Sequence, residues 1–297
     1  MTSTAGVGHF VSWDGGCLLI GSGLGVISPH AHYAIQIAFG SERGIRFRTD
    51  EREDWTEYGG AIIASRQPHS MDATRVRSNV VLFVEPETRE ARALTELYLR
   101  AGSDGIAPLP DALLADVAPA LFAAWRARPS ARAIGDAARR VVRALTGGVE
   151  PSVVSDDRIL RAVAYINAHL DAPLTLDQVA GAAYLSPSRF RHLFVEQTGM
   201  ALRPYILWRR FLRVWDLVTA GESLSAAAHA AGFADAAHLA RTSRRMFGFP
   251  PSALQIGGLL RPEEDAGVRP PTPRGLAAHE TSGQPLGPIA GLRPGVT

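Results

Sequence analysis

The sequence predicts an α+β, multidomain protein with an N-terminal β-barrel or sandwich, a helical linker segment, an all-α C-terminal domain and a disordered tail. Three observations support this fold class. Short apolar or alternating runs separated by Gly, Pro and Asp occupy residues 11–100, stretches rich in Ala, Leu and Arg with helical spacing follow, and one helical pattern occurs twice in residues 157–257. The length of 297 residues is sufficient for about two domains.

Residues 1–100 form the predicted β domain, because runs such as CLLIGSGLGVI, YAIQIAFG and NVVLFVEP have the length and apolar content of strands. Residues two apart on a strand point to the same face, so His30 and His32 are expected to face the interior together. The candidates for lining an effector pocket are Trp13, His30, His32, Tyr33, Gln36 and His69. Ordinary core packing is the alternative role for the aromatic and histidine side chains.

Helical spacing begins in TREARALTELYLR, residues 88–100, and continues over residues 111–126 and 130–146. We therefore interpret residues 101–150 as a helical linker and expect a dimer contact there. The Gly, Pro and Ser residues of TGGVEPSVVSD, residues 146–156, predict a flexible connection to the next domain.

The C-terminal domain, residues 157–257, contains a repeat. The segments LTLDQVAGAAYLSPSRFRHLFVEQTGMALRPYI and SLSAAAHAAGFADAAHLARTSRRMFGFPPSAL each predict a short Ala-rich helix, a turn and a second helix. This is the pattern of a helix-turn-helix unit. The two units span about residues 175–196 and 223–246.

The second helix of the first unit has clear start and stop signals. Ser186 is a good N-cap, Pro187 suits the first helical position, and Gly199 ends the helix. Phe190 and Phe194 lie on one face at a spacing of four and predict a core contact. The opposite face carries Ser188, Arg189, Arg191 and His192. The long helix between the units is expected to expose Arg209, Arg210 and Arg213.

Residues 158–256 resemble the DNA-binding domain of the AraC/XylS family of bacterial transcription regulators. The resemblance rests on DQVAGAAYLSPSRFRHLFVEQTG, on the connecting helix LWRRFLRVWDLV, and on AAGFADAAHLARTSRRMFGFPPSAL. It implies that two recognition helices enter successive major grooves of double-stranded promoter DNA, which recur about every 34 Å. It also implies a homodimer and RNA polymerase as a further partner.

The resemblance places DNA contacts on both units and on the helix between them. The predicted contact residues are Ser188, Arg189, Arg191, His192, Arg209, His238, Arg241, Arg244 and Arg245. Arg191 suits guanine O6 and N7, whereas Arg244 and Arg245 are expected at phosphates. A solvated helix face is the alternative interpretation of all these positions.

The second unit departs from the family pattern. Ala236 and Ala237 stand where relatives carry longer polar side chains, so this unit is expected to read sequence weakly. Ser243 replaces an aromatic residue that usually packs with the residue matching Phe247. Such a loss costs roughly 3 kcal/mol or more unless neighbours such as Leu239 repack.

Residues 10–100 resemble, more loosely, the cupin-like sensor domain of the same regulators, which implies a small effector bound inside a barrel. His30, His32 and His69 resemble the cupin metal motif, with Gln36 where a Glu usually stands. Neutral imidazoles suit zinc, nickel, copper or iron, so a bound divalent metal is one possibility. A metal-free polar pocket and plain core histidines are the others, and no other cofactor is expected.

Charge and composition exclude several classes of protein. Residues 1–157 hold 16 Arg against 19 acidic residues, whereas residues 158–257 hold 11 Arg against 6, a layout that favours a sensor joined to a nucleic-acid binder. The single cysteine, Cys17, excludes an intramolecular disulfide and is expected to be buried. We expect a cytoplasmic protein with no membrane partner, because no apolar run approaches ~20 residues and the N-terminus lacks secretory features. The tail, residues 258–297, has too little apolar content to fold.

The combined prediction is a sequence-specific DNA-binding transcription regulator of the AraC type, not an enzyme, whose small effector shifts the arrangement of its domains. Two alternatives stay open. One is a cupin oxygenase or isomerase that uses His30, His32 and His69 and carries a DNA-binding appendage. The other is a constitutive DNA binder whose N-terminal domain only dimerises. Effector, operator and the choice between activation and repression do not follow from the sequence.

Overall fold

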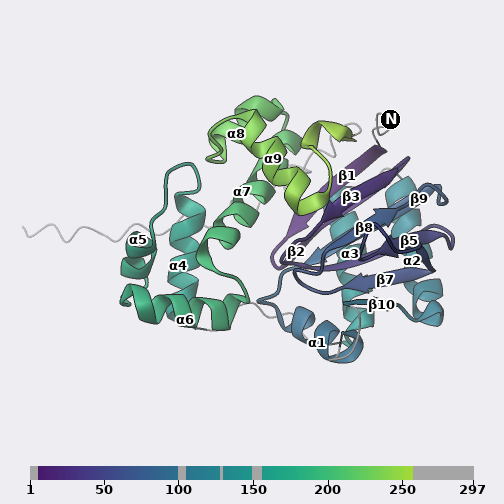
Figure 1. Cartoon of the computed structure of the whole chain (residues 1–297), viewed down its shortest axis with the longest axis horizontal. Helices are drawn as coiled ribbons and strands as arrows, with labels where there is room; N and C mark the ends of the chain where they lie inside the picture. Colours follow the sequence, from purple (N-terminus) through teal and green to yellow (C-terminus); the bar gives the residue numbers. More distant parts are fainter. Residues whose placement is uncertain (1–5, 100–104, 128–129, 149–155, 257–297) are drawn as a thin grey trace, which may run out of the picture. The chain divides into compact units, whose positions relative to one another are not determined.

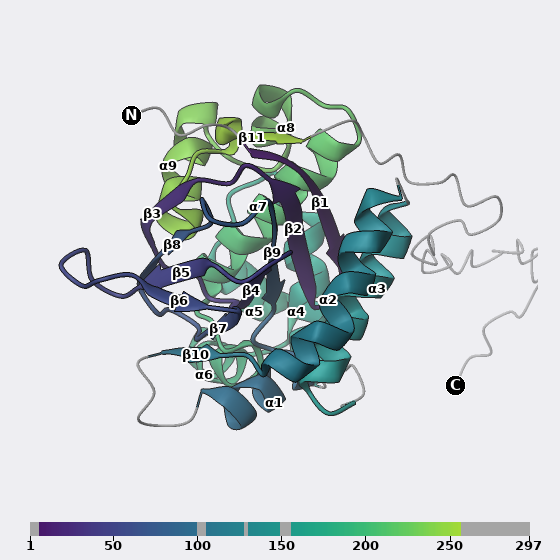
Figure 2. The same cartoon turned by 90° about the vertical axis from the view of Figure 1, so that its right-hand side faces the viewer.

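The computed structural model describes residues 6–99, 105–127, 130–148 and 156–256 (Figures 1 and 2). Most of the predicted flexible connection at residues 146–156 and the whole tail at 258–297, predicted to be disordered, lie outside these described residues.

The N-terminal domain is built on two β-sheets. The larger has the strand order β10-β7-β4-β9-β2-β1-β11 and the smaller has the order β3-β8-β5-β6. In chain order the strands are β1 Gly6–Trp13, β2 Gly16–Ser22, β3 Val26–His30, β4 Ile35–Gly40, β5 Ile45–Arg48, β6 Thr56–Tyr58, β7 Gly60–Ile63, β8 His69–Asp72, β9 Ser78–Val84, β10 Ile106–Pro108 and β11 Leu254–Ile256. Neighbouring strands run antiparallel, apart from β11, which lies parallel to β1. The predicted β-rich domain is confirmed, while closure into one barrel stays a prediction.

Three helices cover one face of the larger sheet: α1 Arg89–Tyr98, α2 Asp111–Arg126 and α3 Ala131–Leu145. Figure 2 shows α2 and α3 beside β1 and β2. The boundary predicted at residue 100 differs from the structure, because β10 extends the sheet and α2 and α3 complete its core. Residues 105–148, where described, therefore belong to the sensor domain, and their role in dimerisation stays a prediction.

Strand β9 shows how the larger sheet separates two cores. All seven of its residues are buried. Val80, Leu82 and Val84 pack with α1–α3, whereas Val81 and Phe83 contribute to the core on the opposite face. This alternation is the period of two expected for a strand, and the face of Phe83 is the one that carries the site described below.

The C-terminal domain is helical, with α7 at its centre (Figure 1). Its helices are α4 Asp157–Ala168, α5 Leu176–Ala182, α6 Pro187–Thr198, α7 Leu202–Thr219, α8 Leu224–Ala230 and α9 Ala236–Phe247, followed by a 3-10 turn at Pro251–Ala253. Both predicted helix-turn-helix units are present, as α5–α6 and α8–α9. The expectation of an all-α domain over residues 157–257 was wrong for Leu254–Ile256, since backbone pairing with β1 makes this segment a strand.

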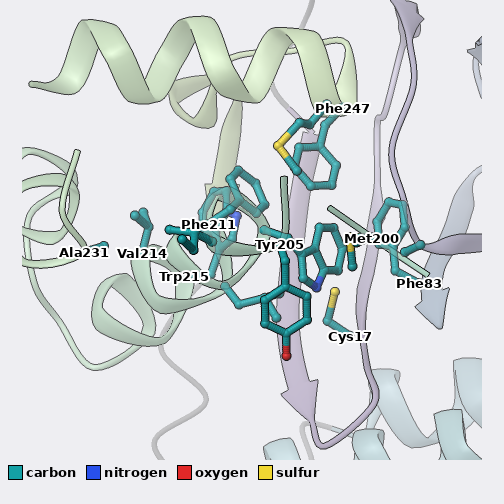
Figure 3. Close-up of a cluster of buried hydrophobic side chains, with 14 of the residues drawn as sticks. Cys17, Phe83, Met200, Tyr205, Phe211, Val214, Trp215, Ala231 and Phe247 are labelled. Carbon is teal, nitrogen blue, oxygen red and sulfur yellow. The ribbon is translucent and has the colours of Figure 1, made fainter. Parts of the chain in front are cut away.

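The two domains share one hydrophobic core. The ring centroids of Phe10 and Trp215 lie 5.8 Å apart, and those of Phe83 and Phe247 lie 5.5 Å apart. Figure 3 shows this mixed cluster, in which Cys17 and Phe83 come from strands and the other labelled side chains from the C-terminal domain. Cys17 is buried, as expected, and burial raises the pKa of its thiol. No helix among the described residues is long and apolar enough to cross a membrane.

Candidate DNA-binding surface and sensor pocket

The first helix-turn-helix unit is held by caps at each helix start. Thr175 and Gln178 form a capping box at α5. The backbone N–H of Gln178 donates to Thr175 Oγ1, and the side-chain Oε1 of Gln178 accepts from the backbone N–H of Thr175. Ser186 caps α6 by accepting from the Arg189 N–H, with Pro187 in the first turn. The helix ends at Gly199, whose φ of 67° is left-handed. These caps are the signals that the sequence carries.

The outer face of α6 is free of protein contacts that would hide it. Ser188, Arg189, Arg191 and His192 are exposed. Phe190 and Phe194 are buried beneath them, with ring centroids 5.0 Å apart. The structure records no ion pair for Arg189 or Arg191 among the described residues, so both guanidinium groups are available to an anionic partner.

The second unit has a comparable recognition helix with fewer long side chains. Asp235 caps α9 by accepting from the His238 N–H at 2.5 Å. Arg241 and Arg244 are exposed, whereas His238 is half-buried with its ring 5.3 Å from that of Phe233. Arg245 is exposed too, but its carbonyl accepts from the Ala31 N–H of the sensor at 3.4 Å.

Ser243 is integrated into the core of the second unit. Its side chain is completely buried and its hydroxyl donates to the Phe249 carbonyl at 2.7 Å. A satisfied buried hydroxyl avoids the desolvation penalty of an unpaired one. Leu239 and Phe247 of the same helix are buried as well.

Arg209 does not lie where the sequence predicts. Its guanidinium donates to Glu85 Oε1 at 3.3 Å and to Asn167 Oδ1 at 3.1 Å, and a quarter of its side chain is exposed. The expectation that Arg209 and Arg210 are exposed was wrong, because Arg210 donates to the carbonyls of Leu170 and Ala172. Both guanidinium groups are thus bonded within the protein, and only Arg213 of the three is exposed, while a DNA contact by Arg209 stays a prediction.

Two buried acidic residues hold α7 on the sensor, and sequence reasoning missed both. Glu85 accepts a second hydrogen bond, 2.9 Å long, from Trp208 Nε1. Glu87 lies near this pair with Oε2 buried and without a partner. Burial, and then the charge of Glu85, raise the pKa of Glu87 to about 8. The only sequence signal was two acids directly after a buried strand, which by itself is typical of a surface loop.

An apolar pocket lies between the two sheets and is closed by the DNA-binding domain. Its open volume is about 40 Å³, so an effector larger than a few atoms would need the lining side chains to move apart. Its apolar wall includes Leu19, Ile27, Met71, Val81 and Phe83, and its closing wall is Phe247 and Phe249. Of the residues predicted to line an effector pocket, His30 and Gln36 line this one.

Trp13 was predicted for this pocket and the structure contradicts that. It is half-buried against the opposite core, beside Val84 and Val142 of a separate pocket. The cause is strand alternation, since Trp13 shares the face of Val11 while Phe10 and Ser12 point to the other domain. Tyr33 and His32 line another recess, next to Leu207 and Arg245.

The three predicted histidines meet. Ring centroids of His30 and His69 lie 4.2 Å apart, and those of His32 and His69 lie 5.3 Å apart. All three are buried, and burial lowers the pKa of each, that of His30 to about 3. The cluster is therefore neutral at pH 7. Gln36 Oε1 lies 2.8 Å from His32 Nε2.

Comparison with known proteins concerns mainly the C-terminal domain. Residues 179–255 match the family model described as Helix-turn-helix domain. Regulatory protein PocR of Salmonella typhimurium is 28% identical over 101 residues, which are 34% of this chain and 33% of that protein. The Arabinose operon regulatory protein of Escherichia coli is 29% identical over 123 residues, 40% of each protein. The chain thus spans well under half the length of these curated relatives.

Solved structures give broader but weaker similarity. ToxT from Vibrio cholerae has a TM-score of 0.47 and 13% identity, covering 76% of this chain and 90% of that chain. The DNA-binding domain of AdpA, solved in complex with a target DNA, has a TM-score of 0.31 and 28% identity, covering 33% of this chain and 89% of that chain. The family match, the sequence relatives and the two capped helix-turn-helix units together show a helix-turn-helix domain at the C-terminus of this chain, similar to parts of the regulatory proteins named above.

Proposed function

We propose that the chain is a sequence-specific DNA-binding transcription regulator controlled through its N-terminal domain. The observation that carries this function is the pair of capped recognition helices, α6 and α9, connected through the single long helix α7. Arg191 on α6 and Arg241 and Arg244 on α9 are exposed cations on helices of the kind that enters the major groove. The regulatory proteins that align with the chain support this function over an enzymatic one.

The sensor pocket supports control by a small apolar or amphipathic effector. Phe247 and Phe249 of the DNA-binding domain form part of its wall, so a molecule entering the pocket touches both domains at once. A ligand shifts a conformational equilibrium only by its differential affinity for the two states. An effector in contact with Phe247 meets that requirement, since any movement of α9 changes the pocket. We further propose that the protein forms a homodimer, interacts with RNA polymerase and is located in the cytoplasm.

Selection of bound duplexes from a random DNA pool at two salt concentrations tests the DNA-binding function. We expect two enriched sequence blocks about one helical turn apart, the spacing of successive major grooves. One block alone would limit sequence reading to the first unit. Binding without enrichment, fading as salt rises, would contradict sequence-specific recognition and favour a constitutive architectural role.

Two arginine variants separate base reading from phosphate binding. Arg191→Ala is expected to cost about 1–3 kcal/mol on the selected site and to relax preference at one base pair. Arg244→Ala is expected to weaken binding to all sequences and to reduce the salt slope by about 1. Fluorescence anisotropy on matched and scrambled duplexes measures both effects. Identical behaviour of the two variants would contradict the assignment.

A further inference from the structure

The three buried histidines of the sensor share one protonation pattern. The Nδ1 atoms of His30, His32 and His69 lie 2.9, 2.8 and 2.9 Å from the backbone carbonyls of Ser28, Ala34 and Gln67. A carbonyl only accepts, so each Nδ1 carries the proton and donates it. In a neutral imidazole the other nitrogen then holds a lone pair. Each ring therefore presents an unprotonated Nε2.

The three histidine rings meet in one buried place. One ligand nitrogen from each ring lies within 4.8 Å of the others. His69 Nε2 is buried and has no hydrogen-bond partner. Native proteins rarely leave a buried hydrogen-bond acceptor without a partner. Because His69 Nε2 lies among other acceptors, its missing partner is expected to be a group that several acceptors can bind together.

Gln36 adds a fourth acceptor. Its Oε1 lies 2.8 Å from His32 Nε2, yet neither atom carries a hydrogen to donate in the tautomer fixed by Ala34. Turning the Gln36 amide over would give His32 Nε2 a donor, since the amide orientation is assigned from its neighbours. That change leaves His69 Nε2 without a partner. A cation placed among the four atoms satisfies all of them together.

We propose that the sensor binds one divalent transition-metal ion through Nε2 of His30, His32 and His69 and Oε1 of Gln36. Three imidazoles suit Zn²⁺, Co²⁺, Ni²⁺, Cu²⁺ or Fe²⁺, whereas Mg²⁺ and Ca²⁺ prefer oxygen ligands. Ligand nitrogens around such an ion, with bonds of about 2.0–2.1 Å, lie roughly 3.4 Å apart. Small side-chain rotations bring the cluster to that spacing.

The supporting shell of the site is already built. A metal-bound histidine almost always donates its other ring N–H to a carbonyl or carboxylate, which fixes the tautomer and the ring orientation. All three Nδ1 atoms here have such a carbonyl. A cluster of ordinary core histidines has no need for three identical tautomers.

Titration of untagged, full-length protein with Co²⁺ tests the site. The protein is first stripped with a chelator and desalted, and visible absorption is then followed as Co²⁺ is added, with Zn²⁺ as competitor. We expect one equivalent of Co²⁺ to bind per protein chain and to give the visible spectrum of a Co²⁺–imidazole site with a low coordination number. Added Zn²⁺ should displace this Co²⁺. Absence of a bound equivalent would overturn the proposal. No DNA is present, so the outcome does not depend on the proposed regulatory function.

Ligand variants locate the ion. His69→Phe keeps a ring of similar size and is expected to weaken Co²⁺ binding roughly 100-fold or more, because outer-shell partners alone are worth about 10–100-fold. The matched control is His169→Phe, which changes the exposed C-cap histidine that follows α4 and should bind Co²⁺ as the parent does. Unchanged affinity in His69→Phe would overturn the assignment.

Gln36→Glu provides a test that does not remove a ring. An anionic ligand is expected to tighten Co²⁺ binding at least several-fold and to alter the spectrum, whereas Gln36→Leu should weaken binding. Circular dichroism melting curves check that each variant is folded. If His69→Phe does not fold, Gln36→Glu decides: unchanged affinity and spectrum would exclude Gln36 from the site and overturn the four-ligand proposal.

Discussion

The two helix-turn-helix units are copies of one sequence pattern, yet they stand in different surroundings. Recognition helix α6 presents its polar face without a neighbour from the sensor, and its closest approach there is at its end, where a Cβ on Gly199 would lie 3.2 Å from Pro86. Recognition helix α9 packs its C-terminal end on β3, and a Cβ on Gly248 would lie 2.4 Å from the Ser28 carbonyl. The comparison shows that the recognition helix of the second unit packs directly on a sensor strand, whereas the polar face of the first recognition helix stays exposed.

The largest expected effect comes from removing the side chain that joins the second unit to the sensor. Phe247 stacks on Phe211 at 4.1 Å and lies 5.5 Å from Phe83. Phe247→Ala is expected to lower the free energy of unfolding by about 3–5 kcal/mol. Urea denaturation measures the loss, and hydrogen exchange should rise in β3 and β9 as well as in α9.

The matched variant in the first unit is Phe194→Ala. It removes an equally buried ring and should cost a similar free energy of unfolding. Increased hydrogen exchange is expected in α4–α7 while β3 and β9 stay protected. An equal rise of hydrogen exchange in β3 in Phe247→Ala and Phe194→Ala would contradict the conclusion that only the second recognition helix packs on this strand.

A smaller effect is expected from Arg209, which ties α7 to the sensor. Arg209→Ala leaves Glu85 buried without its cation, and we expect a loss of roughly 2–3 kcal/mol, below the range for fully buried pairs because part of the guanidinium reaches solvent. Arg213→Ala, on an exposed position of the same helix, should change stability by no more than about 0.5 kcal/mol. Thermal or urea unfolding compares the two. Similar losses would show that the Glu85 pairing contributes nothing.

The last prediction is a pH dependence set by Glu87. Its pKa is about 8 in the folded protein against an ordinary value of 4.5, so between these values the folded state keeps a proton that the unfolded state releases. The free energy of unfolding should therefore fall as pH rises from about 4.5 to about 8 and then level off. Glu87→Gln should remove this part of the fall. Melting temperatures of both proteins across this range measure it, and parallel curves would count against the assignment.

Local signals predicted the elements of the DNA-binding domain well. The caps Ser186 and Asp235, the buried pair Phe190 and Phe194, and the left-handed Gly199 all involve residues close together in the chain. These interactions depend on residues only a few positions apart, so the exposed face of α6 could be predicted from the sequence.

Contacts between distant segments could not be predicted in the same way. Arg209 and Glu85 are 124 residues apart, and nothing in the helical pattern around Arg209 marks it as paired. The acceptor for Ser243 likewise depends on where the chain turns after α9. Trp13 is different, because its shared parity with Val11 was visible in the sequence and would have placed it on the opposite face.

The parallel pairing of β11 with β1 has a consequence for synthesis. Gly6 and Gly8 pair with Leu254 and Ile256, so the edge of the larger sheet stays uncovered until nearly the whole described chain has left the ribosome. An open strand edge is a template for another chain. A sensor domain expressed without residues 254–256 would carry the same open edge, and self-association measured on such a fragment would report the missing strand rather than the assembly of the intact protein.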